Sequence, residues 1–214
     1  MFSLLPRGVP EALLFLVIVG FILLVVRAVR RRRAFAPVAA DADLPTLTTS
    51  QRIVGTVRRT WRDPAQGLWL VEIGLGKRKL TFCAADYEQN ATRYQSLIGK
   101  QADLALYALA TLESGGVDAM RDQIKDFDKV DVTPDLVRLI PAGQFANDHA
   151  VIGRALSHRD EEMDGLPLTI YRTQVLRGDD LTLVLELAAQ RSDTPFPDQS
   201  MVHGSARLFG YLAD

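Results

Sequence analysis

Three histidines and one run of acidic residues are the groups in this sequence that could hold a metal ion. His149, His158 and His203 show neither the His-x-x-x-His nor the Cys-x-x-Cys spacing that presets a zinc site. The run from His158 to Asp164 could gather a hard cation through its carboxylates, but it lacks the spaced oxygen ligands and the central glycine of an EF-hand loop. We interpret this run as a charged turn between two strands and expect no metal site.

Nucleophilic catalysis and phosphate binding have no local signature either. The chain contains no Gly-x-Ser-x-Gly elbow, no Gly-x-x-x-x-Gly-Lys loop and no Gly-x-Gly-x-x-Gly turn. Cys83, the only cysteine, lies in an apolar, strand-like run, where a small buried residue is the usual role of a free thiol. We therefore expect no cofactor and no catalytic residue. A hydrolase whose active site is assembled from residues distant in the sequence stays open as an alternative.

A basic and aromatic stretch is the best candidate for a binding face. Its members fall on what reads as two neighbouring strands: Arg58, Arg59, Trp61, Trp69, Lys77, Arg78 and Lys79. Cations interleaved with aromatic rings are typical of surfaces that bind single-stranded nucleic acid. Beyond residue 40, however, the chain carries 19 basic and 25 acidic residues, a balance that counts against a general nucleic-acid binder. A membrane-tethered ligand or single-strand binder is therefore the alternative, and a solvated hairpin face the simpler interpretation.

The N-terminal region reads as a membrane anchor. Residues 12–26 carry no charged or hydrogen-bonding side chain, so as a helix in water they would leave an uncovered apolar surface. The apolar run is followed at once by five arginines, namely Arg27, Arg30, Arg31, Arg32 and Arg33. By the positive-inside rule these arginines stay in the cytoplasm. The sequence thus predicts a single-pass protein of the cell inner membrane, with its N-terminus outside and everything from Ala34 onward in the cytoplasm.

The candidate binding face must be positioned by the region that follows this anchor. Residues 34–50 are small and punctuated by proline, which indicates a flexible linker after the anchor and its basic stop at residues 1–33. Apolar and polar residues then alternate, most clearly at residues 181–187. We expect a fold that is mainly β with minor α. It comprises a first β module, a connector with a short helix and a second β module, at residues 51–112, 113–148 and 149–214.

The two β modules read as copies of one another. Gly55 is followed twelve residues later by Gly67, and Gly153 is followed twelve residues later by Gly165. Further on, Leu80-Thr81 matches Leu181-Thr182, and the pair Gly99 and Leu104 matches Gly204 and Leu208 with one residue of slippage. These matches predict a tandem repeat.

A helix is expected between the third and fourth strands of the first module. Asp86 can cap it, with Gln89 as the reciprocal partner three positions on. Three strands, a helix and another strand is the order of an OB-type barrel. The second module has a loop with two prolines in place of the helix, so its match is partial. We expect two tandem small OB-like barrels, and the sequence leaves open whether they are separate barrels or one sheet.

Taken together, these features predict an anchored interaction protein. The lipid bilayer is its first partner, and its cytoplasmic β-rich module is expected to bind another protein, itself membrane-associated, or to scaffold a membrane complex.

Overall fold

The computed structural model describes residues 47–49, 51–116, 119, 136–163, 165–178 and 181–213. The chain divides into two compact units, residues 1–39 and 40–214, and all the described residues belong to the second. The predicted anchor with its five arginines lies outside these ranges, as does most of the predicted connector helix. Within them, no helix is both long and apolar enough to cross a membrane.

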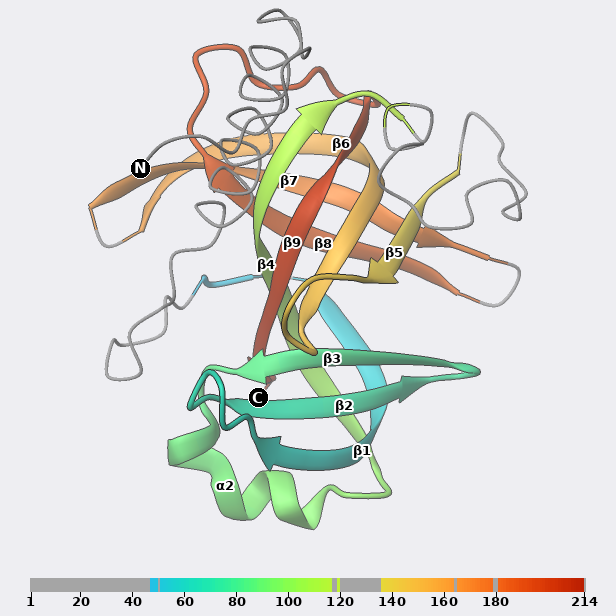
Figure 1. Ribbon diagram of the computed structural model, residues 1–214, viewed down its shortest axis with the longest axis vertical. Coiled ribbons are helices and arrows are strands. Elements are labelled where there is room, and N and C mark those ends of the chain that lie inside the picture. Colours follow the sequence, from blue (N-terminus) through green and yellow to red (C-terminus); the bar gives the residue numbers. More distant parts are fainter. Residues whose placement is uncertain are drawn as a thin grey trace, which may run out of the picture. The chain divides into compact units, whose positions relative to one another are not determined.

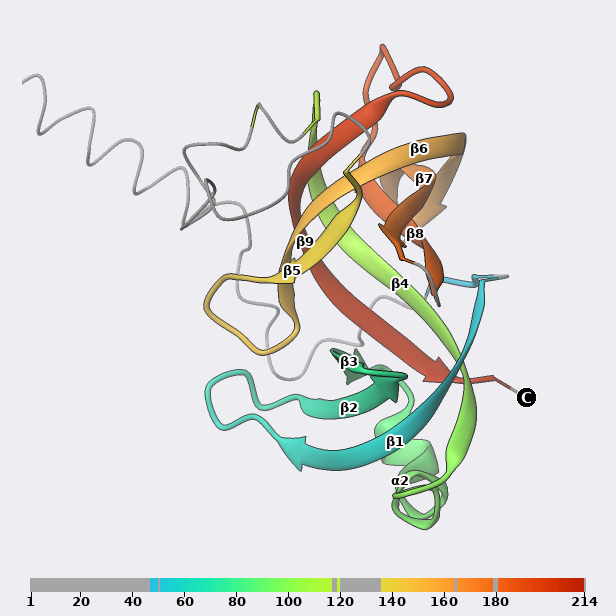
Figure 2. The same ribbon diagram turned by 90° about the vertical axis from the view of Figure 1, so that its right-hand side faces the viewer.

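The described part of the second unit is mainly β, with one short helix. Its elements are β1 (Arg52–Arg62), β2 (Trp69–Leu75), β3 (Arg78–Ala84), α2 (Tyr87–Ser96), β4 (Gln101–Ser114), β5 (Arg138–Pro141), β6 (Asp148–Met163), β7 (Leu166–Arg177), β8 (Thr182–Gln190) and β9 (Met201–Leu212). Figure 1 and Figure 2 show these elements from two directions.

All these strands belong to one sheet, in the order β1-β2-β3-β9-β4-β8-β7-β6-β5. Additional pairings of β1 with β4 and of β9 with β6 close the sheet twice. The first ring is β1-β2-β3-β9-β4, and the second ring is β4-β8-β7-β6-β9. Strands β4 and β9 pair with each other from Leu104–Leu212 to Ser114–Val202 and belong to both rings (Figure 1). The two strand series are therefore parts of one continuous sheet.

The same pairings recur in the two halves of the chain. Strands β1 to β4 pair with one another as β6 to β9 do, and the third strand of each half runs parallel to the fourth strand of the other. A β-bulge lies at the same place in both halves, between Val57 and Arg59 in β1 and, 98 residues further on, between Ala155 and Ser157 in β6. The two rings thus share their topology and the position of their main irregularity.

Hydrogen bonds next to the bulge correspond as well. The N–H of Gly99 donates to the carbonyl of Val57 at 2.8 Å, and the N–H of Gln199 donates to the carbonyl of Ala155 at 2.6 Å. Gly99 and Gln199 also share a left-handed backbone, with φ of 82° and 67°. Residues of β4 and β9 therefore correspond at a shift of 100 residues, and the predicted match of Gly99 and Leu104 with Gly204 and Leu208 is wrong.

The third strands correspond at a larger shift than the sequence predicted. The position of Cys83 beside β9 is equivalent to the position of Ala188 beside β4. Leu80 is consequently equivalent to Leu185, and its predicted match with Leu181 is wrong. Leucine occupies every second position from Leu181 to Leu187, so the sequence alone offers several registers for this strand.

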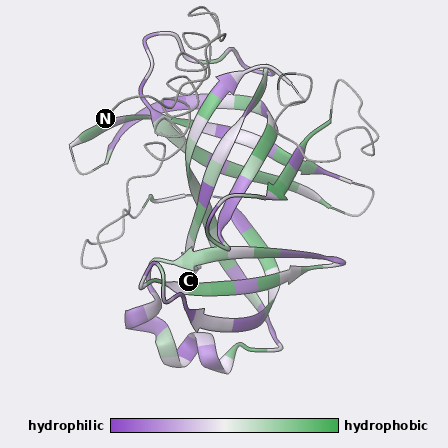
Figure 3. Ribbon diagram, in the orientation of Figure 1, coloured by the Kyte–Doolittle hydropathy of each residue, from purple (hydrophilic) through white to green (hydrophobic). Residues whose placement is uncertain are grey.

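One apolar core fills both rings. Hydrophilic and hydrophobic residues alternate along the strands (Figure 3), so each strand turns one face inward. The inward cluster includes Val71 and Leu104 from the first ring, and Val175 and Leu185 from the second. Because this cluster is continuous, the rings share a core as well as two strands.

The segments that precede β1 and β6 pack on the outer face of the sheet. Leu47 is 1% exposed, and its backbone N–H bonds to the Tyr107 hydroxyl. At the equivalent place in the other half, Phe145 lies 4.8 Å from the Arg207 guanidinium. The last residues of the predicted linker, 47–49, are thus part of the folded region.

Helix α2 forms where the sequence predicts it, but its start is held differently. Asp86 makes no side-chain cap to the helix backbone. Its carboxylate instead accepts the Tyr94 hydroxyl at 2.6 Å, the Asn90 amide at 2.9 Å and the N–H of Leu212 in β9 at 3.2 Å. The predicted capping box is therefore wrong. Asp86 instead attaches the helix to the last residue of β9.

The acidic run is also placed differently from the prediction. Strand β6 continues to Met163, which pairs with Leu166 of β7, so His158 to Met163 form part of a strand instead of a turn. Strand alternation sends successive charged side chains to opposite faces, which disperses them.

Candidate functional site

An open groove of about 640 Å³ lies over β1, β2 and β3 and is the first candidate site. We call it the first groove; its lining residues are Thr56, Val57, Arg58, Arg59, Glu72, Lys79 and Gly99. The β-bulge explains why two successive arginines line it. In a regular strand Arg58 and Arg59 would point to opposite faces, whereas the register shift between Val57 and Arg59 lets both reach the groove.

The carboxylate of Glu72 lies at the centre of the first groove, between two cations. Nη2 of Arg59 lies 3.0 Å from Oε2 of Glu72, and Nζ of Lys79 lies 3.4 Å from Oε1. Burial favours the neutral acid, but the hydrogen bond and charge of Arg59, followed by those of Lys79, outweigh it and hold the pKa of Glu72 below its ordinary value. Glu72 is thus ionised at neutral pH and orients both cations.

Arg58 is the cation of the first groove that makes no ion pair with any residue that the structure describes. A Cβ atom at Gly74 of β2 would lie only 2.5 Å from Nε of Arg58, so the missing side chain at Gly74 is what allows the guanidinium to lie against the strand. With Arg58, Arg59 and Lys79 around Glu72, the groove has two net positive charges and donors that face solvent.

The structure brings together only part of the predicted basic and aromatic face. Trp61 belongs to it, because the Arg59 guanidinium lies 4.5 Å from the Trp61 ring. Trp69 does not: its ring stacks on Tyr87 of α2 at 4.2 Å, and its Nε1 donates to Glu88. The two tryptophans separate because Trp61 pairs with Leu70, the neighbour of Trp69, and adjacent residues of a strand face opposite sides.

The remaining two predicted residues lie at the β2–β3 turn. Lys77 occupies the turn itself and Arg78 begins β3. The Arg78 guanidinium approaches Gly178, next to the β7–β8 turn, instead of the first groove. Of the predicted set, Arg58, Arg59 and Lys79 therefore line the groove, and Trp61 lies next to it against Arg59.

A smaller groove of about 210 Å³ lies over β6, β7 and β8. We call it the second groove; it is lined by Gln51, Ser157, His158, Arg159, Ile170, Arg172 and Glu186. Glu186 is 3% exposed, and its two oxygens accept from Nη1 and Nη2 of Arg159 at 2.6 and 3.2 Å. Arg172 stands directly across from Glu186 in the β7–β8 pairing.

Sequence reasoning missed the second groove, although a signal was present. Interpretation of the run beginning at His158 as a turn does not take account of the strand alternation that puts Arg159 on the same face as Ile170. Only the register of β6 against β7 and β8 shows that Arg159, Arg172 and Glu186 lie together.

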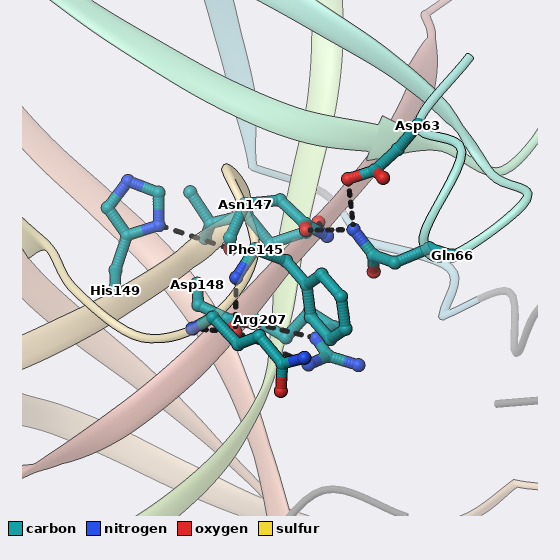
Figure 4. A network of polar contacts seen from close by, with 9 residues as sticks. Asp63, Gln66, Phe145, Asn147, Asp148, His149 and Arg207 are labelled. Atoms are coloured by element: carbon teal, nitrogen blue, oxygen red, sulfur yellow. Dashed lines mark hydrogen bonds and ion pairs between the residues drawn. The ribbon is translucent and has the colours of Figure 1, made fainter. Parts of the chain in front are cut away.

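A buried polar network joins the two halves beside β9 (Figure 4). Nε of Arg207 donates to Asp148 at 2.8 Å, and both side chains are at least nine-tenths buried. Asn147 donates to the Leu208 carbonyl and accepts from Gln66 of the β1–β2 loop at 3.3 Å. Among the described residues, Oε1 of Gln66 is the one buried side-chain atom of this network without a hydrogen-bond partner. The other polar groups named here bind one another, so we assign the network to stability.

The histidines are dispersed through the second ring. Nδ1 of His149 bonds to the Asn147 carbonyl, and burial lowers the pKa of His149, which keeps the ring neutral at pH 7. His203 contacts the Gly115 carbonyl through Nδ1, and Nε2 lies 3.6 Å from Glu113. No cluster of three or more metal-ligating side chains occurs among the residues that the structure places.

Comparisons with protein-family models, with curated proteins and with solved structures give no match to this chain. The two grooves are therefore the features of the described residues from which a function can be inferred. Each groove contains a carboxylate that accepts a hydrogen bond from an arginine, and such an arrangement suits the binding of a charged ligand.

Proposed function

We propose that this chain is a single-pass inner-membrane protein whose cytoplasmic region binds another protein through the first groove without catalysing a reaction. The observation that carries the proposal is the placement of Arg58, Arg59 and Lys79 around the single carboxylate of Glu72. Such an excess of exposed donors fits an acidic segment of the partner. The anchor comes from the apolar residues 12–26 and the arginines that follow them.

The distribution of charge along the chain supports this assignment. Residues 51–100 carry nine basic and four acidic side chains, whereas residues 101–214 carry ten basic and nineteen acidic side chains. The positive charge of the folded region is thus concentrated on the elements that build the first groove. An acidic segment would be steered to the first groove before any other part of the folded region.

We further propose that the folded region is a tandem duplication of an OB-like barrel. The first ring has the OB strand order if β9 serves as its fifth strand, and the second ring has it if β4 does. Helix α2 also stands between the third and fourth strands. OB-type barrels bind ligands over their second and third strands, and the first groove uses Glu72 of β2 and Lys79 of β3.

Site-specific photo-cross-linking in cells tests the proposed docking face. A photoreactive amino acid at Thr56, inside the first groove, is expected to give a discrete adduct in inner membranes, and the same group at Glu88 on α2 is the control. The adduct should disappear in the Arg58→Glu variant. An adduct that persists in this variant, or equal adducts at both positions, would contradict the proposal.

Topology can be tested independently of the groove. The full chain fused at its C-terminus to alkaline phosphatase should be inactive, and the corresponding green fluorescent protein fusion should fluoresce, because both reporters would lie in the cytoplasm. Phosphatase activity would place the folded region on the opposite side of the membrane.

Single-stranded nucleic acid is the second candidate ligand. It is favoured by the OB-like strand order and by Trp61, whose ring lies next to the groove with Arg59. Oligothymidylate binding at low salt, lost on raising the salt and in the Trp61→Ala variant, would support this candidate. If the chain binds oligothymidylate but not a hexaglutamate peptide, nucleic acid replaces the acidic protein segment.

A further inference from the structure

We infer that the second groove is a second docking site for an acidic segment, so that one chain engages its ligand at two places. This inference rests on the function proposed for the first groove. It comes from the internal correspondence of the two halves, which puts both grooves over the first three strands of their own half.

The register of the strands makes the two positions equivalent. Arg59 follows the bulge in β1 as Ser157 does in β6, and each lies opposite a charged residue of the next strand, Glu72 or Arg172. In the third strands, Glu186 takes the place of Thr81. Each groove therefore has one carboxylate next to arginines. This carboxylate lies on the second strand of the first half (Glu72 of β2) and on the third strand of the second half (Glu186 of β8).

This exchange leaves Arg172 as the cation that faces a ligand. Glu186 is already neutralised by the two-point contact with Arg159. Arg172 is exposed and forms no ion pair with a described residue. A carboxylate entering this groove would meet the Arg172 guanidinium, and the Ser157 hydroxyl and the Gln51 amide line the same cavity as further donors.

Three neighbouring carboxylates each contact a residue other than Arg172. Asp160 accepts from Arg191 and Thr169, and Asp198 lies 3.4 Å from Nδ1 of His158. Glu161 lies 3.2 Å from Nη2 of Arg159. The second groove has fewer open cations and about a third of the volume of the first. We therefore expect it to hold one carboxylate and to bind more weakly.

Titration of the full chain in neutral nanodiscs with a labelled hexaglutamate peptide tests the inference. Two peptides should bind per chain, one more weakly. Arg172→Glu should remove the weaker event and leave the stronger one, and Arg58→Glu should do the reverse. Arg172→Gln should weaken the weaker event by about tenfold, the loss expected for one charge-assisted hydrogen bond. Arg177→Glu, the same charge change outside the groove on β7, should change neither event.

The outcomes separate this inference from the function on which it rests. A single binding event that is lost in Arg58→Glu and unchanged in Arg172→Glu would overturn the second site and leave the first groove standing. No peptide binding by the unaltered chain at low salt would overturn both. A far-ultraviolet circular dichroism spectrum identical to that of the unaltered chain shows that each variant is folded.

Discussion

Glu72 links the stability of the fold to the charge of the first groove. Its pKa is lowered in the folded chain by Arg59 and Lys79. A lowered folded pKa stabilises the fold above the unfolded pKa, and this contribution is lost as the pH falls through the folded value. Acid should therefore lower the stability of the fold by protonating this carboxylate.

The Glu72→Gln substitution separates these two effects. At pH 7 we expect a loss of about 1 kcal/mol in the free energy of unfolding, because two exposed cations lose their carboxylate. Hexaglutamate binding should instead become stronger, since the groove gains one net positive charge. Chemical denaturation at several pH values checks the first effect: the difference from the unaltered chain should shrink below pH of about 4.5, the ordinary glutamate value. A difference that is constant down to pH 3 would contradict the role given to Glu72.

Cys83 should be inert in the native protein. It is fully buried on the outer face of β3, and burial raises the pKa of its thiol to about 12. A maleimide reagent at pH 7 should label it only after unfolding. Cys83→Ala should cost about 1 kcal/mol, and Cys83→Ser more, because the hydroxyl would be buried without a partner. Rapid labelling without denaturant would show that this part of the sheet opens.

At the scale of elements, Asp86 determines how α2 is attached to the sheet. Replacement by Ala should cost about 2–3 kcal/mol, because a carboxylate that accepts three hydrogen bonds is removed and the Tyr94 hydroxyl loses its acceptor. Asp86→Ser discriminates between attachment and capping. Serine is a good N-cap but cannot reach Leu212 and Tyr94, so it should be as destabilising as alanine in thermal unfolding. Recovery of stability in Asp86→Ser would restore the capping interpretation.

The β class and the helix at Asp86 could be predicted because they depend on local patterns. Period-two alternation along a strand and an aspartate at the start of a helix are features of a few neighbouring residues. The composition of the first groove could be predicted only in part, because the bulge at Arg58 inverts the alternation in β1 and puts Trp61, but not Trp69, on the groove side. A bulge is set by pairing with a partner strand, so it leaves no clear trace in one strand's sequence.

The sequence could not predict that the two rings share strands. A strand such as β9 has the same alternation whether it closes its own ring, the other ring, or both. The repeat of glycines at a shift of 98 residues predicts two similar halves, but only the parallel pairings of β3 with β9 and of β4 with β8 show that each half supplies a strand to the ring of the other.

For the whole molecule, shared strands imply shared stability. Because β4 and β9 belong to both rings, neither ring can unfold without breaking strand pairings of the other. The Arg207–Asp148 pair and the contact between Gln66 and Asn147 reinforce this coupling. We therefore expect one cooperative transition for the folded region, in contrast to the two transitions that separate barrels would give.

Two equivalent substitutions can test this cooperativity with a natural probe. Both tryptophans of the chain, Trp61 and Trp69, lie in the first ring, so their fluorescence reports on that ring. Leu185→Ala in β8 should lower stability by about 2–5 kcal/mol through loss of buried volume, and its equivalent Leu80→Ala in β3 is the matched control. If the rings unfold together, Leu185→Ala shifts the tryptophan transition as far as it shifts the circular dichroism transition, as Leu80→Ala does. A tryptophan transition that Leu185→Ala leaves in place, while circular dichroism shows earlier melting, would mean that the second ring unfolds alone and that β4 and β9 do not couple the rings.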